Sequence, residues 1–241
     1  MPDIEVSTEG LTIVQNDGRL TARINRSGGN LITMAMCDQL TQLLLHPPEG
    51  AHVLILSAAG ESFCLGRERT ATTAHELPNE VRRLIAVNEA LLKTPLVTVA
   101  RVQGDVAGFG VGLAALCDVA VAVEDARWSF PEVQMALAPT LVLAWLPRLI
   151  GRRNAFWLTA TGAVIDSAAA LEMGLINEVV TDLAALDAAV EHRVDVLERH
   201  DPRVHAEIRG MLRASAGLTE EQAYELSADR LVVGSLLRRR T

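Results

Sequence analysis

The chain has 241 residues, of which 22 are Lys or Arg and 30 are Asp or Glu, so its formal net charge is −8. Proteins that bind nucleic acids or anionic membranes usually carry a surplus of basic residues. The negative net charge therefore argues against both classes of partner. With 49% hydrophobic and 22% charged residues, the composition is that of a globular protein and excludes a disordered chain.

The first half of the chain alternates strand-like and helix-like patterns. Residues 12–14 and 20–24 flank the turn sequence Asn16-Asp17-Gly18, which predicts a hairpin. Helices are predicted over residues 33–46, 79–93 and 112–116, and strands over residues 53–56, 96–102 and 119–123. Strands and helices that alternate at this spacing imply crossover connections, and therefore a largely parallel sheet with helices outside it.

The last part of the chain carries only helical patterns, over residues 183–198, 202–214 and 219–237. Thr219-Glu220-Glu221-Gln222 has the form of a capping box that begins the last of these helices. The sequence therefore predicts an α/β core over residues 1–180 and a helical region over residues 181–241.

The cysteines and the N-terminus indicate a cytoplasmic protein. Cys37, Cys64 and Cys117 form neither a CxxC pair nor a zinc-type spacing, so we expect small buried hydrophobes and no metal site. The first residues are acidic where a secretory leader is basic. The most apolar stretch, residues 135–149, contains two prolines and is too short to cross a bilayer.

Two glycine-containing segments follow predicted strands, at residues 62–68 and 104–112. A glycine-rich turn between a strand and a helix directs free backbone N–H groups toward one point, which suits an anion or a developing negative charge. Close packing of the backbone is the alternative interpretation. The second segment reads G-x-G-x-G and lies in mid-chain, which argues against a dinucleotide-binding protein, and the sequence contains neither a Walker phosphate loop nor a G-x-S-x-G elbow.

Several blocks together resemble, in order and spacing, the enoyl-CoA hydratase/isomerase (crotonase) family. They are residues 63–68, 94–104, 107–110, 117–118, 124–132, 146–151 and 168–177. The resemblance covers roughly residues 20–180. It implies a crotonase-like α/β fold, in which ββα turns form a spiral core and a C-terminal helical region serves trimer assembly. It also implies an acyl-CoA substrate, no cofactor other than the CoA of that substrate, and a homotrimer or a hexamer made of two trimers.

The resemblance also implies a catalytic site. The backbone N–H groups of Arg67 and Phe109 would hold the thioester oxygen as an enolate forms, and Glu132 matches the second of the two glutamates that hydratases of the family use. The position of the first glutamate is occupied by Gly112. The substrate-binding residues expected by position are Cys64, Leu65, Gly66, Arg69, Gly108, Gly110, Gly112, Pro139 and Thr140.

A single glutamate favours two activities equally, double-bond isomerisation by a proton shuttle and an atypical hydration, with a family decarboxylase third. A non-catalytic acyl-CoA binder that has lost its first glutamate is the rival interpretation. Glu132 is alternatively a first-turn helix carboxylate after Pro131. Asp105 is expected to stabilise a turn or to be solvated.

The segment at 140–145 departs from the glycine-rich segment that is usual in the family at this place. It is bulky, which predicts either a narrowed acyl pocket or a rerouted acyl chain, and it contains no acid, which argues against dienoyl isomerisation and dehalogenation. Arg67 and Arg69 are candidates for CoA phosphates, although solvated arginines are the more common case. Trp145 and Trp157 are expected to pack in the core or an interface rather than line the pocket.

Overall fold

The computed structural model describes residues 4–238, with side chains described for residues 7 and 9–236. Residues 1–3 and 239–241, which belong to the predicted core and the predicted helical region, lie outside the described residues. The chain divides into two compact units, residues 1–199 and 200–241.

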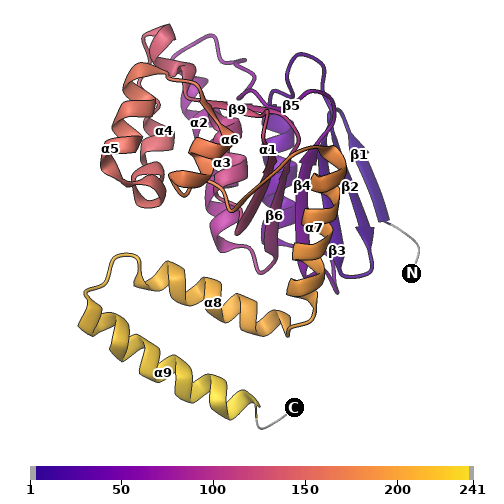
Figure 1. The fold of residues 1–241 in the computed structure, drawn as a ribbon, viewed down its shortest axis with the longest axis vertical. Coiled ribbons are helices and arrows are strands. Elements are labelled where there is room, and N and C mark those ends of the chain that lie inside the picture. The colour runs from indigo at the N-terminus through magenta and orange to yellow at the C-terminus, as the bar shows by residue number, and fades with distance from the viewer. Residues whose placement is uncertain (1–3, 239–241) are drawn as a thin grey trace. The chain divides into compact units, whose positions relative to one another are not determined.

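A seven-stranded sheet forms the centre of the first unit (Figure 1). In spatial order its strands are β1 (Ile4–Thr8), β2 (Leu11–Asn16), β3 (Arg19–Ile24), β4 (Val53–Ala58), β6 (Val97–Val102), β8 (Val119–Val123) and β11 (Glu178–Val180). The first three strands pair antiparallel, and β3, β4, β6, β8 and β11 pair parallel. The predicted hairpin is confirmed, because β2 and β3 pair across the turn at residues 16–19.

A second sheet has four short strands, in the order β10 (Ile165–Asp166), β9 (Arg127–Ser129), β7 (Asp105–Ala107) and β5 (Ser62–Cys64). Strands β5, β7 and β9 pair parallel. They follow β4, β6 and β8, so the chain passes repeatedly from the large sheet to the small one and then into a helical segment. This repeat gives the predicted ββα spiral.

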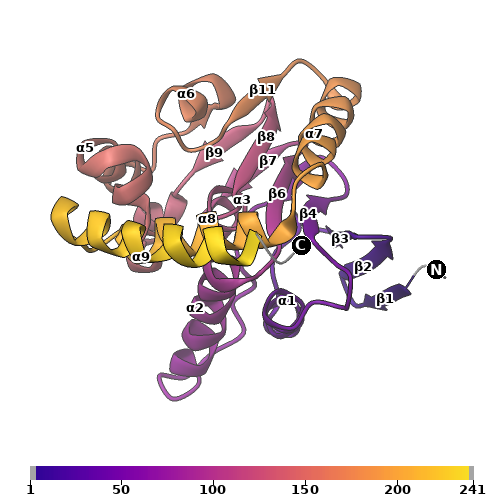
Figure 2. The ribbon, with the colours of Figure 1, turned by 90° about the horizontal axis from the view of Figure 1, so that it is seen from below.

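The first unit contains seven helices among its described residues. They are α1 (Met34–Leu45), α2 (Leu77–Lys93), α3 (Phe109–Ala115), α4 (Thr140–Leu143), α5 (Leu146–Thr161), α6 (Ser167–Glu172) and α7 (Leu183–Glu198), with a 3₁₀ turn, η1, at Pro131–Met135. Figure 2 shows α1 on one side of the large sheet and α7 on the other. Leu186, Val190 and Val194 of α7 are buried in the core.

This packing sets the boundary between the two units. The helical region predicted from the sequence begins at residue 181, whereas the first unit extends to Arg199, because α7 buries its apolar face against the core. The second unit holds α8 (Pro202–Ser215) and α9 (Glu220–Arg238). The predicted capping box is confirmed: the Thr219 N–H donates to Gln222 Oε1 at 3.0 Å, and the Gln222 N–H donates to Thr219 Oγ1 at 3.3 Å.

Two further findings bear on the sequence analysis. Cys37 and Cys64 are buried, as predicted, and Cys117 is half-buried. Along the described residues 4–238, no helix combines the length and the apolar character needed to cross a bilayer.

Candidate active site

The predicted catalytic groups lie just beyond the ends of three neighbouring strands. Arg67 follows β5, Phe109 follows β7, and Glu132 follows β9. These strands run parallel and adjacent, so their carboxyl ends meet at one edge of the small sheet. Residues far apart in sequence are thereby brought to one place.

The backbone at Arg67 presents its N–H group away from the neighbouring segment. The Ile32 N–H donates to Gly66 O at 3.0 Å, and the Glu68 N–H donates to Ile32 O at 2.8 Å. In such a parallel bridge the residue between these partners directs its own N–H to the opposite side. Within the described chain, no acceptor pairs with the Arg67 N–H. It is a free donor at the edge of a cavity.

The second free donor is the N–H of Phe109, the first residue of α3, which therefore has no acceptor within the helix. Gly108 precedes it with φ +52° and ψ −120°, a conformation that residues with a side chain rarely adopt. The Gly108 N–H donates to Ser129 O at 3.0 Å and so ties the turn to the end of β9. This bond fixes the direction of the Phe109 N–H.

Glu132 lies beside the same turn. A methyl group on Gly108 would lie only 2.8 Å from Glu132 Oε1, so the glycine leaves room for the carboxylate. Burial raises the pKa of the Glu132 carboxyl, although a hydrogen bond from its own backbone N–H and the charge of Arg69 act in the opposite sense. Glu132 Oε2 is buried and has no hydrogen-bond partner among the described residues. A half-buried carboxylate with a raised pKa and a covered, unpaired oxygen is suited to proton transfer.

Arg67, Phe109 and Glu132 line one cavity of about 480 Å³. Of the substrate-binding residues predicted from the sequence, those that also line it are Leu65, Gly66, Arg69, Gly108, Gly112, Pro139 and Thr140. Its remaining walls are largely apolar and include Leu77, Val81 and Leu84 of α2, Met135, Leu137, Leu141 and Val142. The bulky segment at 140–145 therefore forms part of the wall, as the sequence suggested.

Two predicted substrate-binding residues do not line the cavity. Cys64 is buried in the core, and burial raises the pKa of its thiol to about 12. A methyl group on Gly110 would lie 2.1 Å from the backbone oxygen of Cys64, so this glycine allows α3 to approach the end of β5. Cys64 and Gly110 therefore contribute to the site through packing and do not face the cavity.

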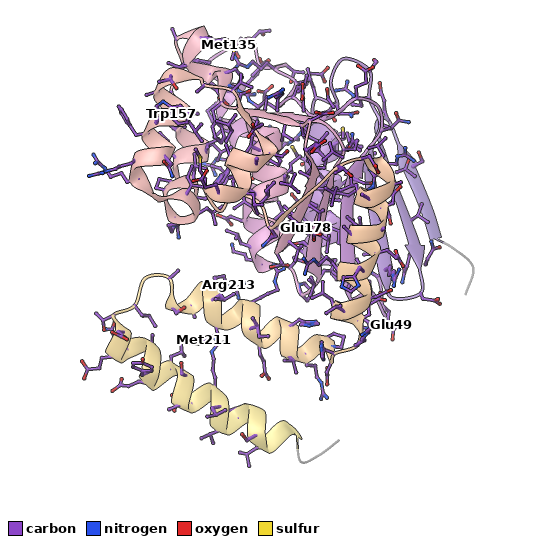
Figure 3. All side chains as sticks on the ribbon, viewed as in Figure 1. Glu49, Met135, Trp157, Glu178, Met211 and Arg213 are labelled. Carbon is purple, nitrogen blue, oxygen red and sulfur yellow. The ribbon has the colours of Figure 1, made fainter. Side chains whose placement is uncertain are left out.

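Other predictions are settled by side-chain contacts. Asp105 Oδ1 accepts from the Arg127 N–H at 2.9 Å and so links the first residues of β7 and β9. Trp145 is buried and lines the cavity, a role that our sequence analysis ranked below packing. Trp157, on α5, is 45% exposed and lies outside the cavity (Figure 3).

Helix α2 provides a wall of the cavity that was not predicted from the sequence. Leu77, Val81, Leu84 and Asn88 follow one another at intervals of four, three and four residues, so they share one face of the helix. The only signal was Asn88 itself, a polar residue within the apolar stripe of a predicted helix.

Glu80, also on α2, organises the loop that carries Arg67. Its carboxylate accepts from the Thr70 hydroxyl at 2.6 Å, from the Thr70 N–H at 2.9 Å and from the Ala71 N–H, and it pairs with the Arg67 guanidinium. These hydrogen bonds lower the pKa of Glu80 to about 2, and the bond from the Thr70 hydroxyl has the largest effect. Desolvation of the carboxylate acts in the opposite sense. The Arg67 side chain is thus engaged with Glu80, which leaves the exposed Arg69 as the better candidate for a phosphate contact.

Replacing Glu80 with glutamine is expected to lower the free energy of unfolding by about 2 kcal/mol at neutral pH and to slow turnover, because Arg67 loses its partner. The wild-type carboxylate has a folded pKa of about 2 and an ordinary value of 4.5. Its stabilisation is therefore complete above pH 4.5 and is lost as the pH falls toward 2. Urea unfolding at neutral pH and at about pH 3 measures the difference between the two proteins, which shrinks in acid.

Glu76→Gln is the matched control for this change, because Glu76 is an exposed carboxylate that accepts from Thr72 and Thr73 on the same loop. Equal free energies of unfolding for the Glu80 variant and the wild type at neutral pH would contradict the role of Glu80.

Comparisons with known proteins identify the family of this chain and several of its relatives. A family model for enoyl-CoA hydratase/isomerase matches residues 18–234. Enoyl-CoA hydratase AKT6-1 of Alternaria alternata is 28% identical over 214 residues, which are 88% of this chain and 72% of that protein. The Thermus thermophilus protein named "Putative enoyl-CoA hydratase" is 27% identical over 207 residues, which are 83% of this chain and 81% of that protein. A crystal structure of an enoyl-CoA hydratase/isomerase family protein from Silicibacter pomeroyi superposes with a TM-score of 0.88, at 28% identity over 94% of this chain and 98% of that one.

Proposed function

The chain belongs to the enoyl-CoA hydratase/isomerase family, and on this basis we propose that it converts acyl-CoA thioesters through an enolate. The observation that carries the proposal is that two backbone N–H groups without a partner among the described residues and one half-buried carboxylate line a single, largely apolar cavity. The CoA moiety belongs to the substrate, and the proposed chemistry uses no further cofactor.

The N–H groups of Arg67 and Phe109 would donate to the thioester oxygen. That oxygen gains negative charge when a proton leaves C2, so donors fixed in advance stabilise the enolate more than the substrate. The apolar walls exclude water and strengthen these hydrogen bonds. Arg69, exposed at the rim, would meet the phosphates of CoA.

Glu132 would move the proton. In isomerisation its carboxylate takes a proton from C2 of a 3-enoyl thioester, and the electron pair moves into a dienolate. The same proton then returns at C4, which leaves a 2-enoyl thioester. Hydration of a 2-enoyl thioester and loss of carbon dioxide from a carboxylated acyl thioester pass through a related enolate, so the site suits these reactions as well.

The proposal is tested by incubating the protein with 3-enoyl-CoA, 2-enoyl-CoA and a carboxylated acyl-CoA. The ultraviolet absorbance of the conjugated thioester follows the first two reactions, and the release of carbon dioxide follows the third. Turnover of any of the three supports an enolate-forming enzyme and identifies the activity. Tight acyl-CoA binding by calorimetry without turnover across the panel would instead support a non-catalytic binder, which Gly112 at the place of the first family glutamate favours.

We also infer that the second unit joins copies of the chain into a trimer or a pair of trimers. Its helices expose large apolar side chains, Leu212, Tyr224 and Leu231 among them, each about 70% exposed. Another part of this surface is a groove between α8 and α9, which Met211 of α8 lines (Figure 3). Exposed apolar area of this kind is a signature of an interface.

Replacing Leu231 with aspartate is therefore expected to convert the assembly to monomers, because a buried carboxylate at an interface is costly. Light scattering coupled to size exclusion measures the mass. Val164→Asp places the same change on an exposed residue of the first unit and serves as the control. A wild-type protein that is monomeric at working concentration would contradict the inference.

A further inference from the structure

Two buried polar atoms in the cavity have no hydrogen-bond partner among the described residues, in addition to Glu132 Oε2. They are Asn88 Oδ1 and Trp145 Nε1, and each residue is only 7% exposed. Folded proteins rarely leave such groups unpaired, because burial removes the water that would satisfy them. A ligand atom or a bound water is therefore expected at this point.

The two groups lie beside Gly112. From the position that a methyl group on Gly112 would take, the indole Cζ2 of Trp145 is 3.4 Å away, Asn88 Oδ1 is 3.7 Å away and the indole Cε2 is 3.8 Å away. The indole nitrogen is bonded to Cε2, so it lies one bond from an atom that borders this space. The glycine at 112 keeps this space open, and all three residues line the cavity with Glu132.

The chemistry of the pair defines what it can bind. The indole N–H only donates, and a carbonyl oxygen of an amide only accepts. A hydroxyl oxygen accepts from one partner and donates to the other, and so satisfies both at once. Neither group carries charge, so the pair offers nothing to neutralise a carboxylate or an ammonium group.

We propose that Asn88 and Trp145 form a neutral subsite that binds one hydroxyl oxygen, either the water that adds to the acyl chain or an alcohol already carried by that chain. The inference rests on the proposed function and specifies the substrate chemistry of the same site. It also assigns a use to the space beside Gly112, where hydratases of the family carry a glutamate.

For bound water the step balances with Glu132 as the one acid and base. The water oxygen bonds to C3 of a 2-enoyl thioester while one water proton passes to the Glu132 carboxylate. The π electrons move into the enolate, whose oxygen the two backbone N–H groups hold. Glu132 then returns its proton to C2, which yields a 3-hydroxyacyl thioester.

The test compares two reactions in Asn88→Leu and Trp145→Phe, each of which removes the polar atom and keeps much of the volume. Hydration of 2-enoyl-CoA requires the water, whereas exchange of the C2 proton of a saturated acyl-CoA in D₂O requires only enolate formation. If the subsite holds water, the ratio of hydration to exchange falls about tenfold in each variant. Asn79→Leu on exposed α2 surface and Trp157→Phe on α5 are the controls, and they keep the wild-type ratio.

If the subsite holds an alcohol of the substrate, the ratio stays constant. The dissociation constant of a hydroxylated acyl-CoA, measured by calorimetry, then rises about tenfold relative to that of the unsubstituted thioester. A hydration-to-exchange ratio and a binding preference that both match the controls would overturn the subsite. Absence of C2 exchange and of all turnover in the wild-type protein would overturn the proposed function instead.

Discussion

Replacing Glu132 with glutamine is expected to lower turnover by about 100- to 10,000-fold, because the amide cannot accept a proton from C2. Glutamine has nearly the same shape, so the cavity and its affinity for acyl-CoA are expected to persist. Steady-state kinetics on the active thioester and calorimetry with acyl-CoA measure the two effects separately. Glu124→Gln changes an exposed carboxylate in the same way and is the control. Unchanged turnover would remove Glu132 from the mechanism.

The same variant has a predicted signature in stability. Burial raises the pKa of Glu132 in the folded state above its ordinary value of 4.5. The folded protein therefore holds this proton more tightly than the unfolded chain, and the ionised carboxylate destabilises the fold as the pH rises from 4.5 through the folded pKa. The neutral side chain of glutamine does not ionise, so the variant does not lose stability as the pH rises through this range. Urea unfolding is expected to show the variant as the more stable protein at neutral pH, with the difference vanishing in acid.

The pH dependence of turnover follows from the same shift. Proton abstraction needs the ionised carboxylate, so turnover is expected to rise with pH, with an inflection above 4.5. An inflection at or below the ordinary value of a glutamate would contradict the burial of this group.

The second large effect is expected from Phe109→Pro. Proline fits the first position of a helix and removes one backbone N–H, so α3 is expected to remain while one of the two oxyanion donors disappears. Loss of one such donor costs about 100- to 1,000-fold in turnover.

Phe109→Ala is the matched control, because it removes the buried ring and keeps the N–H group. Circular dichroism and urea unfolding show whether both variants fold, and the comparison of their turnover numbers isolates the donor. Equal turnover in the proline and alanine variants would exclude the Phe109 N–H as a donor to the substrate.

The large elements of the fold were predictable because their patterns are long. Strand β8 and helix α7 have the predicted bounds, since a continuous apolar run and a complete amphipathic stripe define them. The small sheet was not predictable by periodicity. Strands β5, β7 and β9 each contain three residues, fewer than a pattern needs. Yet the candidate catalytic groups follow these strands, so the resemblance to a family, rather than local propensity, located them.

The differences between the predicted site residues and the lining of the cavity have a common cause. Cys64 and Gly110 belong to blocks that resemble the family, but sequence spacing does not tell a glycine beside a substrate from one beside a strand. Conversely, Asn88 and Trp145 are far from those turns in sequence, and only the packing of α2 and the start of α5 brings them to Gly112. The spacing of residues in the sequence predicts where a turn lies, but tertiary packing determines which side chains face that turn.

The shared face of α2 has a practical consequence. Three of its apolar side chains, Leu77, Val81 and Leu84, form a wall of the cavity without contributing to the oxyanion donors or to the proton carrier. Shortening one of them would lengthen the room for an acyl tail while the reacting end stays as it is. The range of acyl-chain lengths that the cavity accepts is therefore adjustable at a single helix. These three positions are suitable targets for directed evolution.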